Sequence, residues 1–471
     1  MKLKKLLKDL DVDIKGSKEI EVTGISSHSQ FVAPGSLFIA KKGKAFDGNE
    51  FIPKAVETGA VAVVTDFFNP FLQNITQIIT KDVAKLEALL AKRYYETEKH
   101  PLFLVGITGT NGKTTTAYLV HHLLPSFGLM GTIETVMGKG RFPATLTTAD
   151  VVTNHKTLYE MAGQQLKGVV MEVTSHALDQ NRVEEISFDL GVFTNLSQDH
   201  LDYHGTMDAY LAAKLKLFEQ SKEKIYNLDD PSMKGMQGGT SFAIQCPADL
   251  QAKNISYDLR GTTFDLHYQG KVTPLYTPLI GEYNVYNVLA ALAVAFKKGE
   301  RLSVLKKRLE TFPGVPGRLE RVENERGIHL FVDFAHTPEA LEKVLKTLHD
   351  LKNRKMITVF GCGGERDQDK RPKMGAAAEK YSDTLIITSD NPRSEDPDTI
   401  CAAIKKGVKG SALMEVDRRA AIERALFMAQ EGDIVLIAGR GHEPFQKIKG
   451  RQIPFDDRLV AKELTLHEKN G

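Results

Sequence analysis

A glycine-rich segment, GITGTNGKT (residues 106–114), carries the residues best suited to chemistry. It follows the apolar run LFLVGIT and precedes the helical pattern TTTAYLVHHLL, which predicts a loop between a buried strand and a helix. Glycines let backbone N–H groups turn toward phosphates, and the helix N-terminus adds partial positive charge. Lys113 can then reach the β- and γ-phosphates of ATP, and Thr114 can bind Mg²⁺. Ile107 stands where the usual spacing has its first glycine, but the flanking strand and helix favour a phosphate site over a plain turn with a surface lysine.

A second group of polar residues follows two further predicted strands, GVVMEV and DLGVFTNL. Glu172 comes near the end of the first, after apolar residues and glycine, where a carboxylate beside a phosphate loop is well placed for Mg²⁺. The second strand leads into SQDHLDYHG (197–205), which holds two aspartates and two histidines within six residues. A single such residue would more often be structural, but the cluster at this sheet edge favours metal and phosphate chemistry. Lys214 follows in a predicted helix, and by spacing alone we expect it to be an exposed helical lysine.

The elements that must position these residues predict an α/β protein with three domains. Residues 1–98 hold short apolar runs, among them the buried-strand run AVAVVT, and end in a charged helical stretch over residues 81–100. Residues 99–312 alternate strands with helices, which indicates a mostly parallel sheet with ligands at the carboxyl ends of its strands. The hinge PGVPGR marks the second boundary, and residues 313–471 restart the alternation with HLFVDFA, MITVFGCGG, TLIITSD and DIVLIAGRG. We expect a small N-terminal α/β domain, a central parallel-sheet domain that carries the ATP-type phosphate loop, and a Rossmann-like C-terminal domain, in that order.

The composition excludes several other classes of protein. The chain has 471 residues, of which 42% are hydrophobic and 26% charged, as in ordinary folded proteins. Its 62 basic and 60 acidic residues leave a net charge of +2, with no basic excess for a nucleic-acid groove. Its three cysteines are too few and scattered for a disulfide framework or a zinc cluster. The basic N-terminal segment is interrupted by acids, and no run approaches the about 18 apolar residues of a membrane span. We therefore expect a cytoplasmic monomer with neither nucleic-acid nor membrane partners.

Seven motifs taken together resemble the Mur ligases, over essentially the whole chain and in order. They are GITGTNGKTTT, MEVTSHALDQNRV, NLSQDHLDYHG, LIGEYNVYN, PGRLE, DFAHTP and DNPR. The EVTSHAL block and DNPR are more specific than the phosphate loop, and they are similar to those of the members that add 2,6-diaminopimelate. The resemblance implies ATP-dependent amide synthesis in bacterial peptidoglycan assembly, with UDP-MurNAc-L-Ala-D-Glu and meso-diaminopimelate as substrates. The D-Glu γ-carboxylate would take the γ-phosphoryl group of ATP, and an amine would attack the resulting acyl phosphate.

The resemblance also implies a set of ATP and metal residues. The ATP phosphates would be held by Thr108, Gly109, Thr110, Asn111, Gly112, Lys113 and Thr114. Asn287 would face adenine, and Arg318 and Asp333 would contact the nucleotide from the C-terminal domain. Thr114 and Glu172 would hold one Mg²⁺, and His200 would help position a second together with a carbamylated Lys214. A carbamate turns a cation into an anionic oxygen ligand for Mg²⁺. Lys113, Glu172, His200 and Lys214 are the implied catalytic residues.

Two further sets would bind the other substrates. The implied residues for the nucleotide precursor are Ser29, Thr147, Thr148, Thr174, Gln180 and Arg182. Those for diaminopimelate are Arg366, Asp390, Asn391, Pro392, Arg393, Gly439 and Glu443. The family's usual D-S-R near the uridine site is His28-Ser29-Gln30 here, so an Asp and an Arg are absent. Thr174 replaces a more usual Ser and keeps the hydroxyl. The segment after the phosphate-loop helix is short, with Pro125 ending that helix early.

Three alternatives stay open from the sequence. A lysine-adding ligase of the same family would share the chemistry but lack the Arg of D-N-P-R. Folylpolyglutamate synthase shares the G-T-N-G-K core, but it normally continues with Gly-Ser in place of Thr114-Thr115 and lacks an N-terminal domain of this kind. A regulatory module that binds ATP without making amide bonds would not need Lys113, Glu172, His200 and Lys214 together.

Overall fold

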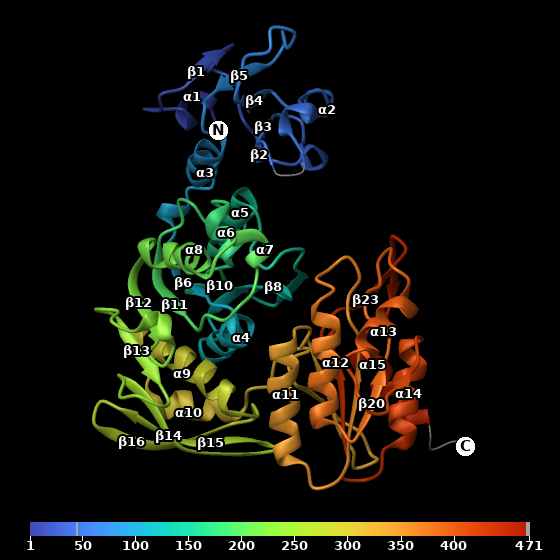
Figure 1. Ribbon diagram of the computed structural model, residues 1–471. Helices are drawn as coiled ribbons and strands as arrows, with labels where there is room; N and C mark the ends of the chain where they lie inside the picture. The colour runs from blue at the N-terminus through green and yellow to red at the C-terminus, as the bar shows by residue number, and fades with distance from the viewer. Residues whose placement is uncertain (44–45, 468–471) are drawn as a thin grey trace. The chain divides into compact units, whose positions relative to one another are not determined.

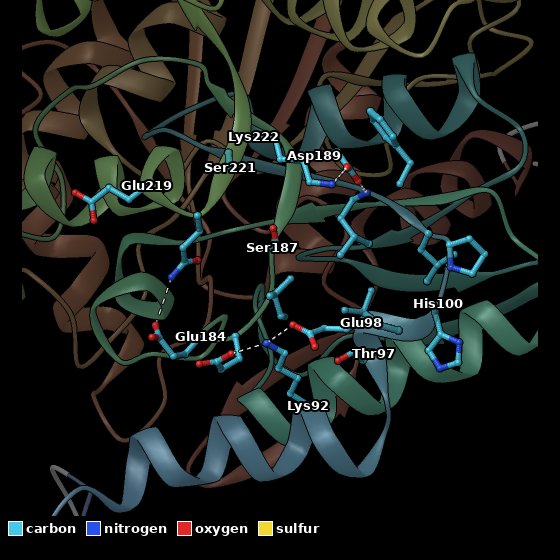
Figure 2. Close-up of a pocket in the computed structure, with 18 of the residues that line it drawn as sticks. Lys92, Thr97, Glu98, His100, Glu184, Ser187, Asp189, Glu219, Ser221 and Lys222 are labelled. Carbon is cyan, nitrogen blue, oxygen red and sulfur yellow. Dashed lines mark hydrogen bonds and ion pairs between the residues drawn. The ribbon is translucent and has the colours of Figure 1, made fainter. Parts of the chain in front are cut away.

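The computed structural model describes residues 1–43 and 46–467 (Figure 1). The chain divides into two compact units, residues 1–251 with 286–305, and residues 252–285 with 306–471. Each unit combines helices with sheets that contain parallel strands, so the predicted α/β class is confirmed. The three-domain division at residues 98 and 312 stays a prediction. Within the described part of the chain, no helix is both long and apolar enough to cross a membrane.

A five-stranded sheet begins the first unit, in the order β1-β5-β4-β3-β2. Strands β2 to β5 run parallel, and β1 pairs antiparallel with β5. The predicted run AVAVVT forms β4, which is buried throughout, and the predicted helix over 81–100 is shorter and forms α3. The strands are β1 (Asp13–Lys15), β2 (Gly24–Ser26), β3 (Ser36–Ile39), β4 (Ala62–Thr65) and β5 (Thr76–Ile79). The α-helices are α1 (Leu3–Leu6), α2 (Ile52–Glu57) and α3 (Val83–Tyr94). The 3₁₀ turns are η1 (Ser29–Phe31), η2 (Gly48–Phe51) and η3 (Thr97–Lys99).

Eight strands of a larger sheet lie in the same unit, in the order β13-β12-β11-β6-β10-β7-β8-β9. Its first six strands in that order are parallel, and the hairpin of β8 and β9 completes it antiparallel. The strands are β6 (Phe103–Thr108), β7 (Phe127–Met130), β8 (Glu134–Met137), β9 (Gly140–Pro143), β10 (Gly168–Glu172), β11 (Phe188–Phe193), β12 (Ser221–Asn227) and β13 (Thr240–Ala243). The helices are α4 (Lys113–Leu123), α5 (Val151–Gly163), α6 (Ser175–Asp179), α7 (Leu201–His204), α8 (Met207–Glu219) and the turn η4 (Pro231–Met233). Because β6, β10 and β11 are parallel neighbours, the segments that follow them leave the sheet at one edge.

Three elements carry the chain between the units, namely β14 (Leu250–Asp258), α9 (Glu282–Lys297) and α10 (Leu302–Glu310). The second unit contains the antiparallel pair β15 (Gly261–Tyr268) and β16 (Lys271–Thr277). Its main sheet has the order β17-β18-β22-β19-β20-β21, and a separate hairpin joins β23 (Phe445–Ile448) to β24 (Arg451–Pro454).

Helices cover both faces of that main sheet (Figure 1). Along β18, Phe331 packs into one apolar core, whereas Leu330 and Val332 pack into the other, as expected when successive side chains alternate. The strands are β17 (Glu320–Val322), β18 (His329–Asp333), β19 (Met356–Phe360), β20 (Thr384–Ile387), β21 (Leu413–Met414) and β22 (Ile434–Ala438), and the helices are α11 (Pro338–Leu351), α12 (Lys370–Tyr381), α13 (Pro397–Lys405), α14 (Arg418–Met428) and α15 (Asp457–His467). The strands β18, β22, β19 and β20 are parallel, so their carboxyl ends also share an edge.

Candidate active site

The phosphate loop joins β6 to α4, as its sequence predicts, and Gly112 caps the helix in a left-handed conformation with φ of 85°. A Cβ atom at Gly112 would lie 2.3 Å from Oδ1 of Asn287, so a larger residue would displace that side chain. Thr116 donates a hydrogen bond of 3.4 Å to the same Oδ1. The structure therefore brings Asn287, the residue implied for adenine, against the phosphate loop.

The loop that follows β11 braces the phosphate loop, and sequence reasoning assigned it no such role. The backbone N–H of Thr110 donates to the carbonyl of Asn195 at 2.8 Å, and the N–H of Asn111 donates to Asn195 Oδ1 at 2.9 Å. Thr194 donates from Oγ1 to the carbonyl of Asn111 at 2.6 Å. The parallel pairing of β6 with β11 is what places these two loops side by side.

Glu172 is fully buried at the end of β10, which removes the possibility of a plain surface carboxylate. Its Oε2 accepts hydrogen bonds from Thr114 Oγ1 at 2.8 Å and from Thr132 Oγ1 at 3.0 Å. Its Oε1 accepts the backbone N–H of Thr132 at 2.8 Å. A Cβ at Gly131 would lie 2.5 Å from Oε1, so glycine there permits the close approach. Thr132 is a site residue that the sequence analysis missed, and the short apolar run FGLM just before it, which forms β7, was the available signal.

Lys113 and Lys214 both donate to the carbonyl of Gly109, each at 2.9 Å. Lys214 is 2% exposed, so the expectation from spacing of an exposed helical lysine is wrong. Its ammonium group also lies 4.3 Å from the ring centre of Tyr210. Burial, together with the charge of Lys113, holds the pKa of Lys214 well below its ordinary value. A neutral buried amine next to a phosphate loop is the chemical state that can combine with CO₂ to form a carbamate.

His200 lies near this lysine pair. It precedes α7 with a left-handed backbone (φ of 54°), and its Nε2 is 3.4 Å from Asp199 Oδ2. Partial burial lowers the pKa of His200, and the charges of Lys113 and Lys214 contribute. His176 contacts the His200 ring, with ring centres 4.7 Å apart.

The residues implied for Mg²⁺ suit a hard cation in their chemistry. The oxygen atoms of Thr114 and Glu172 meet at the start of α4, and such oxygens are preferred Mg²⁺ ligands. Across residues 1–43 and 46–467, no group of three or more His, Cys, Asp and Glu side chains is arranged to hold a metal. The implied ligands include a single carboxylate and a single histidine, with a hydroxyl and a modified lysine besides. The magnesium assignment therefore stays a prediction.

The residues implied for the nucleotide precursor form a connected network beside Glu172, with Ser29 apart in η1. Thr148 donates from Oγ1 to the carbonyl of Glu172 at 2.9 Å and accepts the N–H of Thr174 at 3.1 Å. Arg182 donates to the carbonyl of Thr148 at 3.1 Å and to Gln180 Oε1 at 2.6 Å. Thr147 accepts from Thr132 at 3.1 Å. The structure thus brings together five of the six implied residues, which come from two segments of the sequence, 147–148 and 174–182.

In the second unit, Arg318 and Asp333 meet at the end of β18. Asp333 Oδ2 accepts the backbone N–H of Leu319 at 2.5 Å, which ties the PGR turn to the sheet. The Arg318 guanidinium lies 4.5 Å from the ring centre of Phe334. Burial raises the pKa of Asp333, and the charge of Arg318 offsets part of that rise. Their contact with a nucleotide stays a prediction.

The residues implied for the amino acid lie at the carboxyl ends of β19, β20 and β22. Asn391 donates from Nδ2 to Glu443 Oε2 at 2.6 Å, and a Cβ at Gly439 would lie 2.6 Å from Asp390 Oδ2. Burial and the charge of Asp390 raise the pKa of Glu443. Asp390 and Asn391 are buried and Glu443 is half-buried, so two carboxylates and an amide gather at this edge of the sheet.

Arg393 and Arg366 lie beside each other at the same edge. A Cβ at Gly363 would lie 3.0 Å from Arg393 Nη1 and 3.8 Å from Arg366 Cγ. Arg393, preceded by the buried Pro392, has a left-handed backbone (φ of 55°) and donates to the carbonyl of Gly364 at 2.5 Å. This contact links Arg393 to the loop that follows β19.

A fully buried ion pair, which sequence reasoning missed, joins the loop that contains Asp390 to the loop that contains Gly439. Arg418 donates to both carboxylate oxygens of Asp457, at 2.8 and 2.7 Å. It also donates to the carbonyl of Ser389 at 3.2 Å and to that of Ala438 at 3.0 Å. These carbonyls directly precede Asp390 and Gly439. Nothing in the local pattern of RRAAIERAL distinguishes Arg418 from a surface arginine, so only the fold reveals the brace.

The structure has a phosphate-loop α/β domain followed by a second α/β domain with a polar site. Comparisons with known proteins find the same order of domains. The chain belongs to the Mur ligase family. Its residues 21–95 match the model described as the Mur ligase family catalytic domain, residues 107–295 the Mur ligase middle domain, and residues 317–441 the Mur ligase glutamate ligase domain. The resemblance noted from the seven motifs is confirmed.

Among curated relatives, the chain is similar to UDP-N-acetylmuramoyl-L-alanyl-D-glutamate–2,6-diaminopimelate ligases from several bacteria. The enzyme of Chlamydia caviae is 43% identical, over 98% of this chain and 99% of the relative. That of Aquifex aeolicus is 44% identical, over 94% and 93%. A solved structure of a ligase with the same name is 33% identical, covers 100% of both chains and has a TM-score of 0.71.

More distant structures share the fold. A MurF ligase from Thermotoga maritima in complex with ADP is 20% identical, with a TM-score of 0.65 over 95% of this chain and 98% of its own. A folylpolyglutamate synthase from Mycobacterium tuberculosis is 18% identical, with a TM-score of 0.58 over 74% of this chain and 91% of its own. At these identities the likeness concerns the fold alone.

Proposed function

We propose that the protein is the ATP-dependent ligase that adds meso-2,6-diaminopimelate to UDP-MurNAc-L-Ala-D-Glu. The observation that carries the proposal is the Glu172 network, which joins the phosphate loop through Thr114 to the implied precursor residues through Thr148. Phosphoryl transfer requires the γ-phosphoryl group of ATP and the accepting D-Glu carboxylate to lie next to each other. The network links the residues that we propose bind each of them. The full-length similarity to diaminopimelate ligases supports the same substrates.

The chemical problem is that a carboxylate is a poor electrophile. Transfer of the γ-phosphoryl group to a D-Glu γ-carboxylate oxygen makes a mixed anhydride and leaves ADP. The amine of the amino acid then attacks the acyl carbon, and the tetrahedral adduct collapses to the amide with loss of phosphate and a proton. The protein contributes position and charge, because both steps bring anionic groups together.

The residues of the first unit have distinct roles in the first step. Backbone N–H groups of the loop at 108–114 hold the phosphates, and the Lys113 ammonium neutralises charge on the transferred group. Arg182 and Gln180 bind the precursor, while Thr148 fixes the backbone at Glu172. Mg²⁺ held by Thr114 and Glu172 would withdraw charge from the phosphate oxygens when bound.

The second unit would choose the amino acid. Arg393 offers a planar guanidinium, which pairs with a carboxylate through two parallel charge-assisted hydrogen bonds. The acidic group of Asp390 and Glu443 suits an ammonium. meso-Diaminopimelate carries both groups at its distal end, whereas L-lysine lacks that carboxylate. The proposed preference for diaminopimelate therefore depends on Arg393.

The test is phosphate release from Mg-ATP with the precursor and a panel of amino acids. We expect release that requires both the precursor and meso-diaminopimelate, with L-lysine disfavoured by about 10⁴-fold in kcat/KM. Arg393→Ala should abolish that preference, whereas Arg451→Ala, at an exposed position on β24, should retain it. Equal kcat/KM for the two amino acids in the unmutated protein would refute the assignment. ATP hydrolysis that ignores the precursor would favour a simple ATP-binding module.

A further inference from the structure

A charged pair lies at the carboxyl edge of the N-terminal sheet and belongs to none of the residue sets above. Lys41, two residues beyond β3, donates from Nζ to Oε2 of Glu87 on α3 at 2.5 Å. β2 and β3 are parallel neighbours, with Ser26 opposite Phe38. The segment after β2, which contains the implied precursor residue Ser29, therefore leaves the sheet at the same edge as Lys41.

Burying the Glu87 carboxylate lowers the stability of the fold. Glu87 is 1% exposed, and among the described residues its Oε1 has no hydrogen-bond partner of ordinary geometry, although the nearby Ser27 hydroxyl lowers the pKa of the carboxyl slightly. Burial raises the pKa of Glu87, and the ion pair with Lys41 offsets only part of that rise. Replacing a buried ion pair with apolar residues of similar volume is often neutral or stabilising. A contribution to stability therefore does not explain why a carboxylate is buried here. A function of its partner, Lys41, does explain it.

Lys41 is placed and exposed as a ligand-binding cation would be. Its side chain is 34% exposed, although its partner is buried. An ammonium has three donors, and Glu87 is its single acceptor among the hydrogen bonds of the described residues. The neighbouring segment His28-Ser29-Gln30 holds neither lysine nor arginine. Lys41 can therefore supply the positive charge that an anionic ligand at this edge needs.

Electrostatics also connect this pair to the precursor network. Asp150, which caps α5 two residues after Thr148, raises the pKa of Glu87. Burial lowers the pKa of Arg182, and the charge of the same carboxylate raises it and so offsets part of that effect. Val151, next to Asp150, packs in one apolar core with Leu86 and Ala88, the neighbours of Glu87, so α3 and α5 adjoin at this point.

We propose that Lys41 binds the diphosphate of the nucleotide precursor and that Glu87 is a positioning residue for its ammonium group. The proposal rests on the proposed function, since the diphosphate is that of UDP-MurNAc-L-Ala-D-Glu. Glu87 holds the ammonium at the sheet edge before the ligand arrives. The two donors of Lys41 that Glu87 does not use then bond phosphate oxygens.

The test compares UDP with uridine as ligands of the full-length protein, by calorimetry. The unmutated protein should bind UDP more tightly than uridine. Lys41→Met should weaken UDP binding by about tenfold or more, the effect of losing a charge-assisted hydrogen bond, and leave uridine binding unchanged. The KM for the precursor should rise by the same factor, with kcat and the KM for ATP retained. Lys42→Met, at the adjacent exposed lysine, should match the unmutated protein.

Two further variants separate positioning from folding. Lys41→Arg should keep most of the preference for UDP, and Glu87→Gln should lower it without affecting uridine. If Lys41→Met does not fold, the double variant Lys41→Met with Glu87→Met, which leaves no unpaired charge, should fold and still lack the preference. Unchanged UDP binding in the folded variants, equal losses for UDP and uridine, or no preference for UDP in the unmutated protein would overturn the proposal. Failure of the proposed function would appear separately, as no precursor-dependent phosphate release from the unmutated protein.

Discussion

Lys214 offers the sharpest test of the catalytic site, because its burial is the largest departure from what its local sequence suggests. Lys214→Ala removes three methylene groups and the amine from a side chain that is 2% exposed. At about 0.8 kcal/mol for each buried CH₂, the lost burial costs about 2 kcal/mol. Removing a poorly solvated amine offsets part of this cost. A typical unfolding free energy of about 5–15 kcal/mol leaves such a variant folded.

The loss of activity should be much larger than the loss of stability. If Lys214 is a carbamate, the variant lacks an anionic metal ligand, and losing a comparable electrostatic group costs about 10²–10³-fold in rate. Phosphate release measured with ATP, precursor and amino acid should show this loss. Formate, acetate or propionate should partly restore activity, since a small carboxylate fits the space that the side chain vacates. Lys222→Ala, an exposed lysine on β12, is the matched control and should keep full activity.

Dependence on CO₂ gives a second measurement. Unmutated protein prepared without CO₂ should gain activity when bicarbonate is added, because the unprotonated amine is the form that reacts with CO₂ and the lowered pKa of Lys214 favours that form. Lys214→Ala should not respond to bicarbonate. A Lys214→Ala variant with near normal phosphate release would refute the reasoning outright, since no metal ligand would then have been lost.

Three other predictions follow from single contacts. Thr132→Val removes the hydroxyl bonded to Glu172, and the Mg²⁺ concentration for half-maximal phosphate release should rise by about tenfold; an unchanged titration would contradict this. Arg418→Met removes the hydrogen-bonded partner of the buried Asp457 and leaves only Arg440 Nε, 3.9 Å away, so urea denaturation should show a loss of about 3 kcal/mol in unfolding free energy, and a loss below about 1 kcal/mol would argue against the brace. Burial lowers the pKa of His155 to about 4 from an unfolded value near 6.5, so its neutral form stabilises the fold fully above pH 6.5. The unfolding free energy should fall by up to about 3 kcal/mol as the pH drops from 6.5 to 4, and the slope should flatten in His155→Gln.

The sequence alone predicted the α/β class, the phosphate loop and the placing of Glu172 beside it. These succeed because they depend on local patterns and one topological rule. An apolar run followed by glycines and a helix predicts a strand, a loop and a helix, and parallel strands place their following loops at one edge. Asp390 and Gly439, which the resemblance implied, also follow parallel strands of the second sheet.

The tertiary structure alone decided which side chains are buried and what they contact. Lys214 lies in a helix whose spacing also suits an exposed lysine, and packing against the phosphate loop buries it. Thr132 and Arg418 contact residues 40 and 39 positions away, respectively, and no local periodicity encodes such partners. The Lys41–Glu87 pair spans 46 positions and depends on α3 lying under the carboxyl edge of β3. Local sequence determines which element forms and where it ends, whereas burial and charge pairing arise when distant elements meet.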